Sequence, residues 1–204
     1  DFDTRGGSGL DKNEVTEKLM PANIRKMADL QERLYAENRH AVLIVLQAMD
    51  AAGKDGTIRH VMTGLNPQGT QVVSFKAPSS EESDHDYLWR IARALPRRGE
   101  IGIFNRSHYE DVIVARVHDL VSRSQMPEEL VGPDIWNQRY RQIRDFERYL
   151  EENGITVVKI FLHVSKDEQR DRLLSRINEE EKNWKFSSGD IQERKYWDKY
   201  QEAY

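Results

Sequence analysis

The sequence has 204 residues, with 31 Lys and Arg against 35 Asp and Glu, so its formal net charge is −4 at pH 7. This length suits a single domain, and no apolar run approaches the roughly 20 residues that a membrane helix needs. The chain contains no cysteine, which excludes disulfides and thiolate chemistry and fits a reducing compartment. The balanced charge provides no global field for a polyanion. We therefore expect a cytoplasmic protein that binds neither nucleic acid nor membranes, and any polyanionic partner must meet a local basic site.

Four short, nearly continuous apolar runs predict β-strands that are buried on both faces, as in a parallel sheet. They cover Ala41–Leu46, Thr70–Phe75, Glu100–Phe104 and Thr156–Val164. Between them, apolar residues recur at spacings of three and four, which is typical of amphipathic helices. These patterns predict helices around residues 20–34, 58–65 and 136–150. The alternation predicts an α/β fold with one domain over residues 1–204.

Two helix starts carry the capping-box pattern S-x-x-E, in which the first and fourth residues satisfy each other's backbone N–H. These are Ser79 with Glu82, and Ser165 with Glu168. Gly154 is placed to end the third helix before the last strand. The six histidines show no spacing typical of a metal site, and His163 is expected to be a core residue of the last strand.

The segment between the first strand and the following helix resembles a phosphate-binding loop. Its sequence, Gln47-Ala-Met-Asp-Ala-Ala-Gly-Lys-Asp-Gly-Thr57, places backbone N–H groups at a helix start, where they can bind phosphate oxygens. Against the pattern G-x-x-x-x-G-K-[ST], Gly53 and Lys54 match, but Ala48 and Asp55 do not. Because the Ser/Thr ligand to Mg²⁺ is missing, Asp50 is the nearest alternative. The competing interpretation is a tight turn in which Asp50 caps the helix and Lys54 is solvated.

The third strand is followed by a second polar segment, Asn105-Arg-Ser-His-Tyr-Glu-Asp111. In a parallel sheet this segment should lie beside the first loop. Arg106 could neutralise a transferring phosphoryl group, Ser107 could cap the next helix, and Glu110 or Asp111 could bind a metal or orient a nucleotide. The alternative is an ordinary capped helix start with a surface ion pair.

The last fifty residues contain clustered basic and aromatic side chains. Arg172 and Arg176 are four residues apart and share one helix face, and Lys182 and Lys185 follow. In isolation this helix suggests a solvated face of mixed charge. On a phosphate-loop kinase, such residues belong to a mobile lid over the phosphates. The aromatic residues near the end, from Trp184 to Tyr204, could stack on a base or pack between helices.

Several motifs together resemble the family-2 polyphosphate kinases, over about residues 10–204. They are the loop after the first strand, Asn66-Pro-Gln-Gly69, Ser74-Phe-Lys-Ala-Pro78, Gly102 to Val112, Lys182-Asn-Trp-Lys-Phe186 and Tyr196-Trp-Asp198. The resemblance implies a three-layer α/β/α phosphate-loop kinase fold with a parallel sheet and a helical lid at about 167–190. It also implies Mg²⁺ as cofactor and transfer of a phosphoryl group between inorganic polyphosphate and a nucleotide. Family members continue for some tens of residues past the equivalent of Tyr204, so we expect the C-terminal part of the family domain to be absent.

The resemblance assigns roles to individual positions. It implies Asp50, Lys54 and Arg106 as catalytic residues, with Asp50 also binding the metal. Phosphate and nucleotide would be bound by Ala51, Ala52, Gly53, Asp55, Gly56, Thr57, Lys76, Asn105 and Glu110. Polyphosphate would be bound by the lid residues Arg172, Arg176, Lys182 and Lys185.

Asn105 with Glu110 resembles the subgroup that accepts both AMP and ADP, with ATP as a product. A homo-oligomer, either a dimer or a tetramer, is also expected. Two alternatives stay open: an ATP-dependent nucleotide kinase of the same fold, and a phosphate-binding module without activity. An arginine positioned to stabilise a transition state, such as Arg106, argues against the inactive phosphate-binding module, because binding alone does not need such an arginine.

Overall fold

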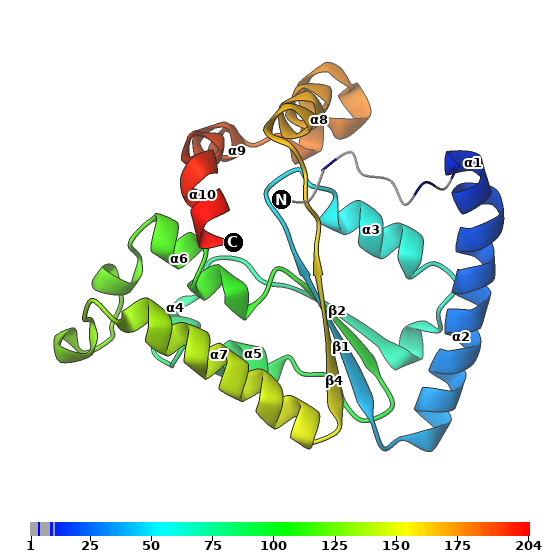
Figure 1. Cartoon of the computed structure of the whole chain (residues 1–204), viewed down its shortest axis with the longest axis horizontal. Helices are drawn as coiled ribbons and strands as arrows, with labels where there is room; N and C mark the ends of the chain where they lie inside the picture. The colour runs from blue at the N-terminus through cyan, green and yellow to red at the C-terminus, as the bar shows by residue number, and fades with distance from the viewer. Residues whose placement is uncertain (1–3, 5–8, 10) are drawn as a thin grey trace.

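The computed structural model describes residues 4, 9 and 11–204, and its centre is one parallel sheet (Figure 1). The strands are β1 Ala41–Gln47, β2 Thr70–Ser74, β3 Ile101–Asn105 and β4 Ile155–Phe161. Their order across the sheet is β2-β3-β1-β4. All four predicted strands are therefore confirmed. The predicted domain also includes residues 1–3, 5–8 and 10, which lie outside the described residues.

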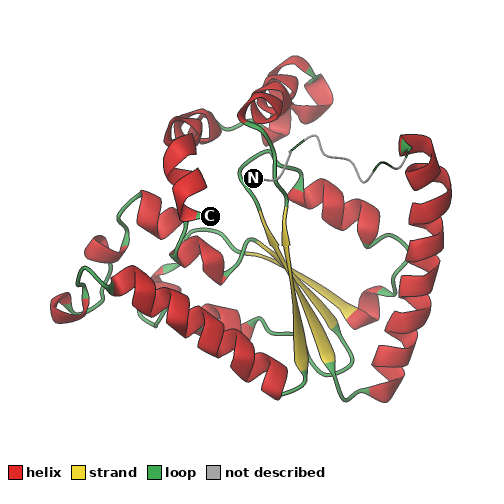
Figure 2. Ribbon diagram, in the orientation of Figure 1, coloured by secondary structure: helices red, strands yellow, loops and turns green. Residues whose placement is uncertain are grey.

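Helices cover both faces of this sheet and give the predicted three layers (Figure 2). On one face, α2 Met20–Glu37 and α3 Lys54–Val61 pack on β1 and β3 through a cluster that includes Leu46 and Ile103. On the other face, α5 Trp89–Arg93 and α7 Ile135–Glu152 pack through a cluster around Leu43 and Phe104. The predicted α/β/α fold is confirmed.

The remaining helices are short except α8, which has 13 residues. The α-helical ones are α1 Lys12–Glu14, α4 Ser80–Ser83, α6 Val114–Val117, α8 Lys166–Asn178, α9 Ser188–Glu193 and α10 Trp197–Ala203. The 3₁₀ turns are η2 Pro67–Gly69, η3 His108–Asp111, η4 Val121–Arg123, η5 Glu128–Leu130, η6 Glu180–Lys185 and η7 Arg194–Tyr196, and η1 Val15–Leu19 is a π-helical turn.

The helix starts and stops follow the sequence signals with one difference. Ser79 and Glu82 form both bonds of a capping box. Ser165 accepts from the N–H of Glu168 at 3.1 Å, but the Glu168 side chain bonds Arg172 instead of completing the box. Gly154 has a φ of 82°, the left-handed conformation that glycine adopts without steric cost.

Two expectations about burial were wrong, both at the edge of the sheet. β1 and β3 are buried almost throughout, but β2 and β4 have a neighbouring strand on one side only and are largely exposed. β4 also ends at Phe161, earlier than predicted. His163 therefore lies beyond the strand and is exposed, so it is not a core histidine.

The parallel register brings the strand ends together. Leu46 of β1 lies opposite Asn105 of β3, which also lies opposite Ser74 of β2. The segments that follow β1, β2 and β3 therefore meet at one edge of the sheet, where ligands bind in open α/β folds. α8 and α9 lie beyond this edge, at the top of Figure 1.

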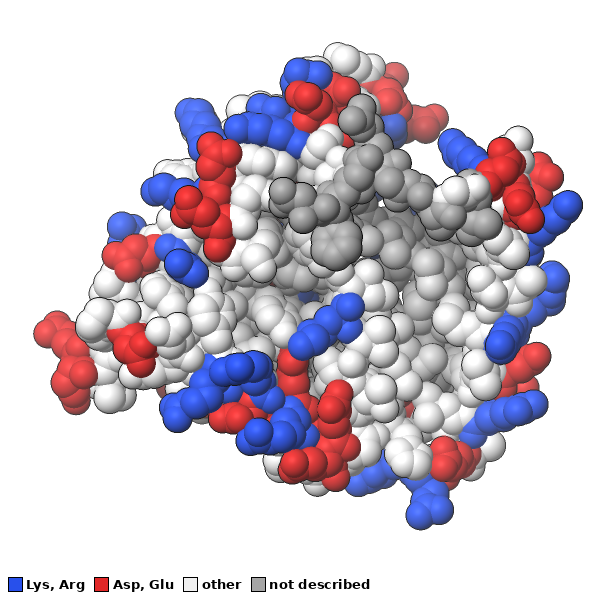
Figure 3. All heavy atoms as spheres, viewed as in Figure 1, with Lys and Arg blue, Asp and Glu red and all other residues white. Residues whose placement is uncertain are grey.

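The surface agrees with the balanced composition. Basic and acidic side chains alternate around the rim of the face in Figure 3. Within the described residues, no helix combines the length and apolarity that crossing a bilayer requires.

Candidate active site

The loop between β1 and α3 has the geometry of an anion-binding cradle. Gly53 is the N-cap of α3, with a φ of 103°, and no side chain caps the helix. In the described part of the chain, the N–H groups of Gly53, Lys54, Asp55 and Gly56 donate to no acceptor, whereas Thr57 N–H donates to Gly53 O at 2.9 Å. Unpaired amides at a helix start attract phosphate oxygens. The interpretation with Asp50 as helix cap is therefore wrong.

Lys54 lies beneath this loop and is not a solvated side chain. It is 9% exposed, and its Nζ donates to Ala48 O at 2.7 Å and to Met49 O at 3.3 Å. Burial, followed by the nearby Arg106 charge, lowers the pKa of Lys54 to about 8, although Asp50 and Glu110 act in the opposite direction. A phosphate group beside Lys54 would favour its charged form.

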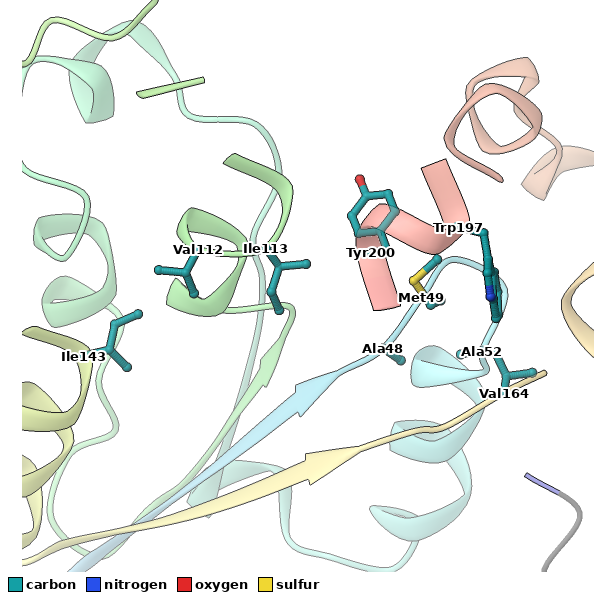
Figure 4. Close-up of a cluster of buried hydrophobic side chains, with 9 residues drawn as sticks. All are labelled: Ala48, Met49, Ala52, Val112, Ile113, Ile143, Val164, Trp197 and Tyr200. Carbon is teal, nitrogen blue, oxygen red and sulfur yellow. The ribbon is translucent and has the colours of Figure 1, made fainter. Parts of the chain in front are cut away.

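The base of the loop is fixed by an apolar cluster (Figure 4). Ala48, Met49 and Ala52 pack in this cluster with Trp197 and Tyr200 of α10. For these two aromatic residues, packing between helices is the correct interpretation. Trp184, by contrast, is 78% exposed.

Arg106 connects the two polar segments. Its Nη2 lies 2.5 Å from Asp50 Oδ1 and its Nη1 lies 3.1 Å from Glu110 Oε2. Burial would lower the pKa of Arg106, but Glu110 and Asp50 outweigh it, so the pKa is raised. Arg106 has a φ of 66°, and a non-glycine residue in this conformation costs on the order of 1–3 kcal/mol.

Hydrogen bonds fix the polar groups around this pair. Gln47 Nε2 donates to Glu110 Oε1 at 2.5 Å, and Asn105 Nδ2 donates to Asp55 Oδ1 at 2.6 Å. Ser107 caps η3 by accepting from the N–H of Tyr109. The helix start is thus capped as expected, but the ion pair of Arg106 reaches across to the first loop.

A cavity of about 900 Å³ unites these groups. Most residues predicted for the site line it, namely Asp50, Ala51, Ala52, Gly53, Lys54, Asp55, Gly56, Lys76, Asn105, Arg106, Glu110, Arg176 and Lys185. Thr57, Arg172 and Lys182 do not line it.

The basic residues after β4 separate into three groups. Arg176 binds Asp190 at 2.6 Å and lines the cavity together with Lys185. Arg172 Nη1 donates to Ala52 O at 2.8 Å and to Ala51 O at 3.3 Å. Lys182 pairs with Glu179, away from the cavity.

Comparison with known proteins shows the family of this chain. A family model described as "Polyphosphate kinase 2 (PPK2)" matches residues 9–204. The chain belongs to the polyphosphate kinase 2 family.

Similar proteins include an ADP-polyphosphate phosphotransferase of Rhodopseudomonas palustris, 56% identical over 196 residues, covering 95% of this chain and 68% of that protein. An AMP/ADP-polyphosphate phosphotransferase of Meiothermus ruber is 54% identical over 193 residues, with coverages of 95% and 68%. The crystal structure of polyphosphate kinase 2 from Arthrobacter aurescens superposes with a TM-score of 0.91 at 42% identity, covering 100% of this chain and 70% of that one.

Two arginines that line the cavity of this polyphosphate kinase 2 chain were not predicted from the sequence. Arg90 and Arg139 are each 8% exposed, and both approach the carboxylate of Asp111, at 3.8 Å and 4.0 Å. Burial raises the pKa of Asp111 to about 6, although both arginines act to lower it. The burial of Arg139 was predictable from the sequence, because Arg139 lies four residues from both Ile135 and Ile143 on the buried stripe of α7.

The residues present fit a Mg²⁺ ion that is shared with substrate phosphates. No group of three His, Asp or Glu side chains able to hold a metal occurs among the described residues. Asp50 lines the cavity beside the amide cradle. Mg²⁺ in kinases is commonly held by one or two carboxylates together with phosphate oxygens and water, and Asp50 can serve as such a carboxylate.

Proposed function

We propose that this chain transfers a phosphoryl group between inorganic polyphosphate and a nucleotide, converting ADP to ATP and AMP to ADP. The observation that carries the proposal is the meeting of the amide cradle, Lys54 and the Asp50–Arg106 pair in one cavity. The printed names of the two bacterial relatives, which specify ADP and AMP/ADP with polyphosphate, support the substrate class.

The proposed reaction is a direct in-line transfer. A β-phosphate oxygen of ADP attacks the terminal phosphorus of polyphosphate, and the bond to the shortened chain breaks, with the electron pair leaving on that chain. The attacking oxygen is already ionised near neutral pH, so no strong general base is needed. Catalysis then depends on positioning and charge neutralisation.

The protein groups divide this work. The cradle amides and Lys54 bind phosphate oxygens, and Arg106 stabilises the equatorial oxygens of the transferring group. Asp50 would hold Mg²⁺, directly or through water, and the bound ion neutralises phosphate charge. Asp55, Thr57, Lys76, Asn105 and Glu110 are proposed to complete the phosphate and nucleotide site.

Residues 167–190 are proposed to act as a lid that excludes water when it closes. Arg176 and Lys185, which already line the cavity, would bind polyphosphate. Lys182 would have to leave Glu179 to do so. We further propose that the protein is cytoplasmic, with which its lack of cysteine is consistent, and that it forms a homo-oligomer.

The test is to incubate the protein with ADP, polyphosphate and Mg²⁺, without ATP, and to measure ATP by luciferase. We expect ATP formation that depends on polyphosphate. If ATP forms only when another nucleoside triphosphate is supplied as donor, the protein is a conventional nucleotide kinase. Nucleotide binding without turnover in either assay would indicate a binding module.

A further inference from the structure

The carbonyl groups of the phosphate loop are held by side chains of α8. Gln169 Nε2 donates to Asp50 O at 3.0 Å, and Arg172 donates to Ala51 O and Ala52 O at 3.3 and 2.8 Å. Three consecutive carbonyls of the loop are therefore bonded by two residues of one helix, more than a hundred positions later in the chain.

These bonds determine the direction of the loop amides. In a planar trans peptide, the C=O of one residue points opposite to the N–H of the next. Holding Asp50 O and Ala52 O toward α8 therefore turns the N–H groups of Ala51 and Gly53 away from α8. Neither N–H has an acceptor in the described part of the chain, and both residues line the cavity.

Gly53 permits the close approach of Arg172. Its φ of 103° already favours glycine. A Cβ at this position would also lie 3.2 Å from Arg172 Nη1, which is tighter than ordinary packing. The loop conformation and the arginine contact thus depend on the same residue.

Gln169 is not explained by stability alone. Its side chain is almost fully buried, at 2% exposure, and its Oε1 has no partner within the described residues. A buried acceptor without a partner costs about 1–3 kcal/mol, which an apolar side chain of the same size would avoid. Glutamine differs from such an apolar side chain in that its Nε2 donates to Asp50 O.

We propose that Gln169 and Arg172 are positioning residues that orient the amides of the phosphate loop and connect the loop to the lid. The role of Arg172 thereby changes from a polyphosphate ligand to a support for the loop. Because α8 also bears Arg176, which lines the cavity, a displacement of α8 alters the anion cradle and the polymer contacts together. This inference rests on the proposed phosphoryl transfer.

The first test compares kinetic constants of Gln169→Met, Arg172→Ala and Arg172→Lys. Misplacing reacting groups by about 1 Å can cost on the order of 10² in rate, so we expect kcat to fall by about that factor in the first two variants. The KM for polyphosphate should change less than about twofold. Arg172→Lys keeps a cationic donor group and should therefore lose less of the rate than Arg172→Ala.

Two matched variants on α8 calibrate the result. Arg170→Ala removes an exposed arginine that pairs only with Asp167 and Asp171 among the described residues, and should behave like the unmodified protein. Arg176→Ala should raise the KM for polyphosphate. If Arg172→Ala instead raises that KM with kcat unchanged, or matches Arg170→Ala, the positioning role is refuted.

A second measurement does not depend on activity. This measurement is amide hydrogen exchange. Among residues 50–57, the N–H groups of Ala52 and Thr57 are hydrogen-bonded, and their exchange without substrate should be faster in Gln169→Met and Arg172→Ala than in Arg170→Ala. Arg172 has 43% of its side chain exposed, so we expect Arg172→Ala to fold even if Gln169→Met does not. Unchanged exchange in Arg172→Ala would overturn the proposal, whereas absence of ATP formation by the unmodified protein would overturn only the proposed function.

Discussion

Glu147 of α7 offers a quantitative test, because it anchors the segment that carries Arg106. Its Oε1 accepts from Tyr109 OH at 2.7 Å and lies 3.3 Å from His108 Nε2. Its Oε2 accepts from Lys159 Nζ of β4 at 2.7 Å. Burial acts to raise the pKa of Glu147, but the hydrogen bonds from His108, Lys159 and Tyr109 outweigh it and lower the pKa to about 2.

The magnitude follows from this pKa. The ordinary value is 4.5 and the value in the protein is about 2, and each unit corresponds to about 1.4 kcal/mol. Because Glu147 is only 7% exposed, little solvent screening applies, and the ionised carboxylate stabilises the fold by about 3 kcal/mol. For a carboxyl with a depressed pKa, this stability is complete above pH 4.5 and is lost as the pH falls toward 2.

The assay is urea unfolding of the unmodified protein and of Glu147→Gln at pH 7, 5, 4 and 3. At pH 7 we expect the variant to be less stable by about 3 kcal/mol, and this difference should shrink by about 2 kcal/mol between pH 5 and pH 3. Glu151→Gln, an exposed position on the same helix, should show no such difference. A difference for Glu147→Gln that stays constant with pH would refute the reasoning.

The remaining predictions concern the rate and the polymer site. Lys54→Ala and Asp50→Asn should each lower kcat at least on the order of 10², the typical effect of removing one charge-stabilising contact; steady-state ATP formation measures this, and a nearly normal rate in either variant would contradict the site. Lys185→Ala should raise the KM for polyphosphate more than the KM for ADP. Arg170→Ala is its control, since Arg170 pairs with Asp167 and Asp171 and does not line the cavity; equal effects of Lys185→Ala on both substrates would argue against polymer binding by Lys185.

The sequence sufficed for features that depend on local pattern. The β1 run and the Gly53-Lys54 pair predicted the cradle, because a buried strand followed by glycine at a helix start admits few geometries. Contacts between distant segments carry no such pattern. The bond from Gln169 to Asp50 O spans 119 positions and depends on how α8 packs.

The basic residues illustrate the same limit. The spacing of Arg172 and Arg176 predicted that they share one helix face. It did not predict which carbonyl or carboxylate each of them contacts. The position of Arg139 on the buried stripe of α7 indicates that it is buried, but no local pattern shows that Arg90 and Arg139 approach the same carboxylate, Asp111.

Asp50 is a counterion of Arg106, and Glu110 is a second one. In the proposed reaction, a phosphate group that binds Arg106 would compete with Asp50 for the guanidinium and would leave the Asp50 carboxylate for a cation. Binding of the anion and of the cation would then favour each other, and by thermodynamic reciprocity each would raise the affinity for the other to the same degree.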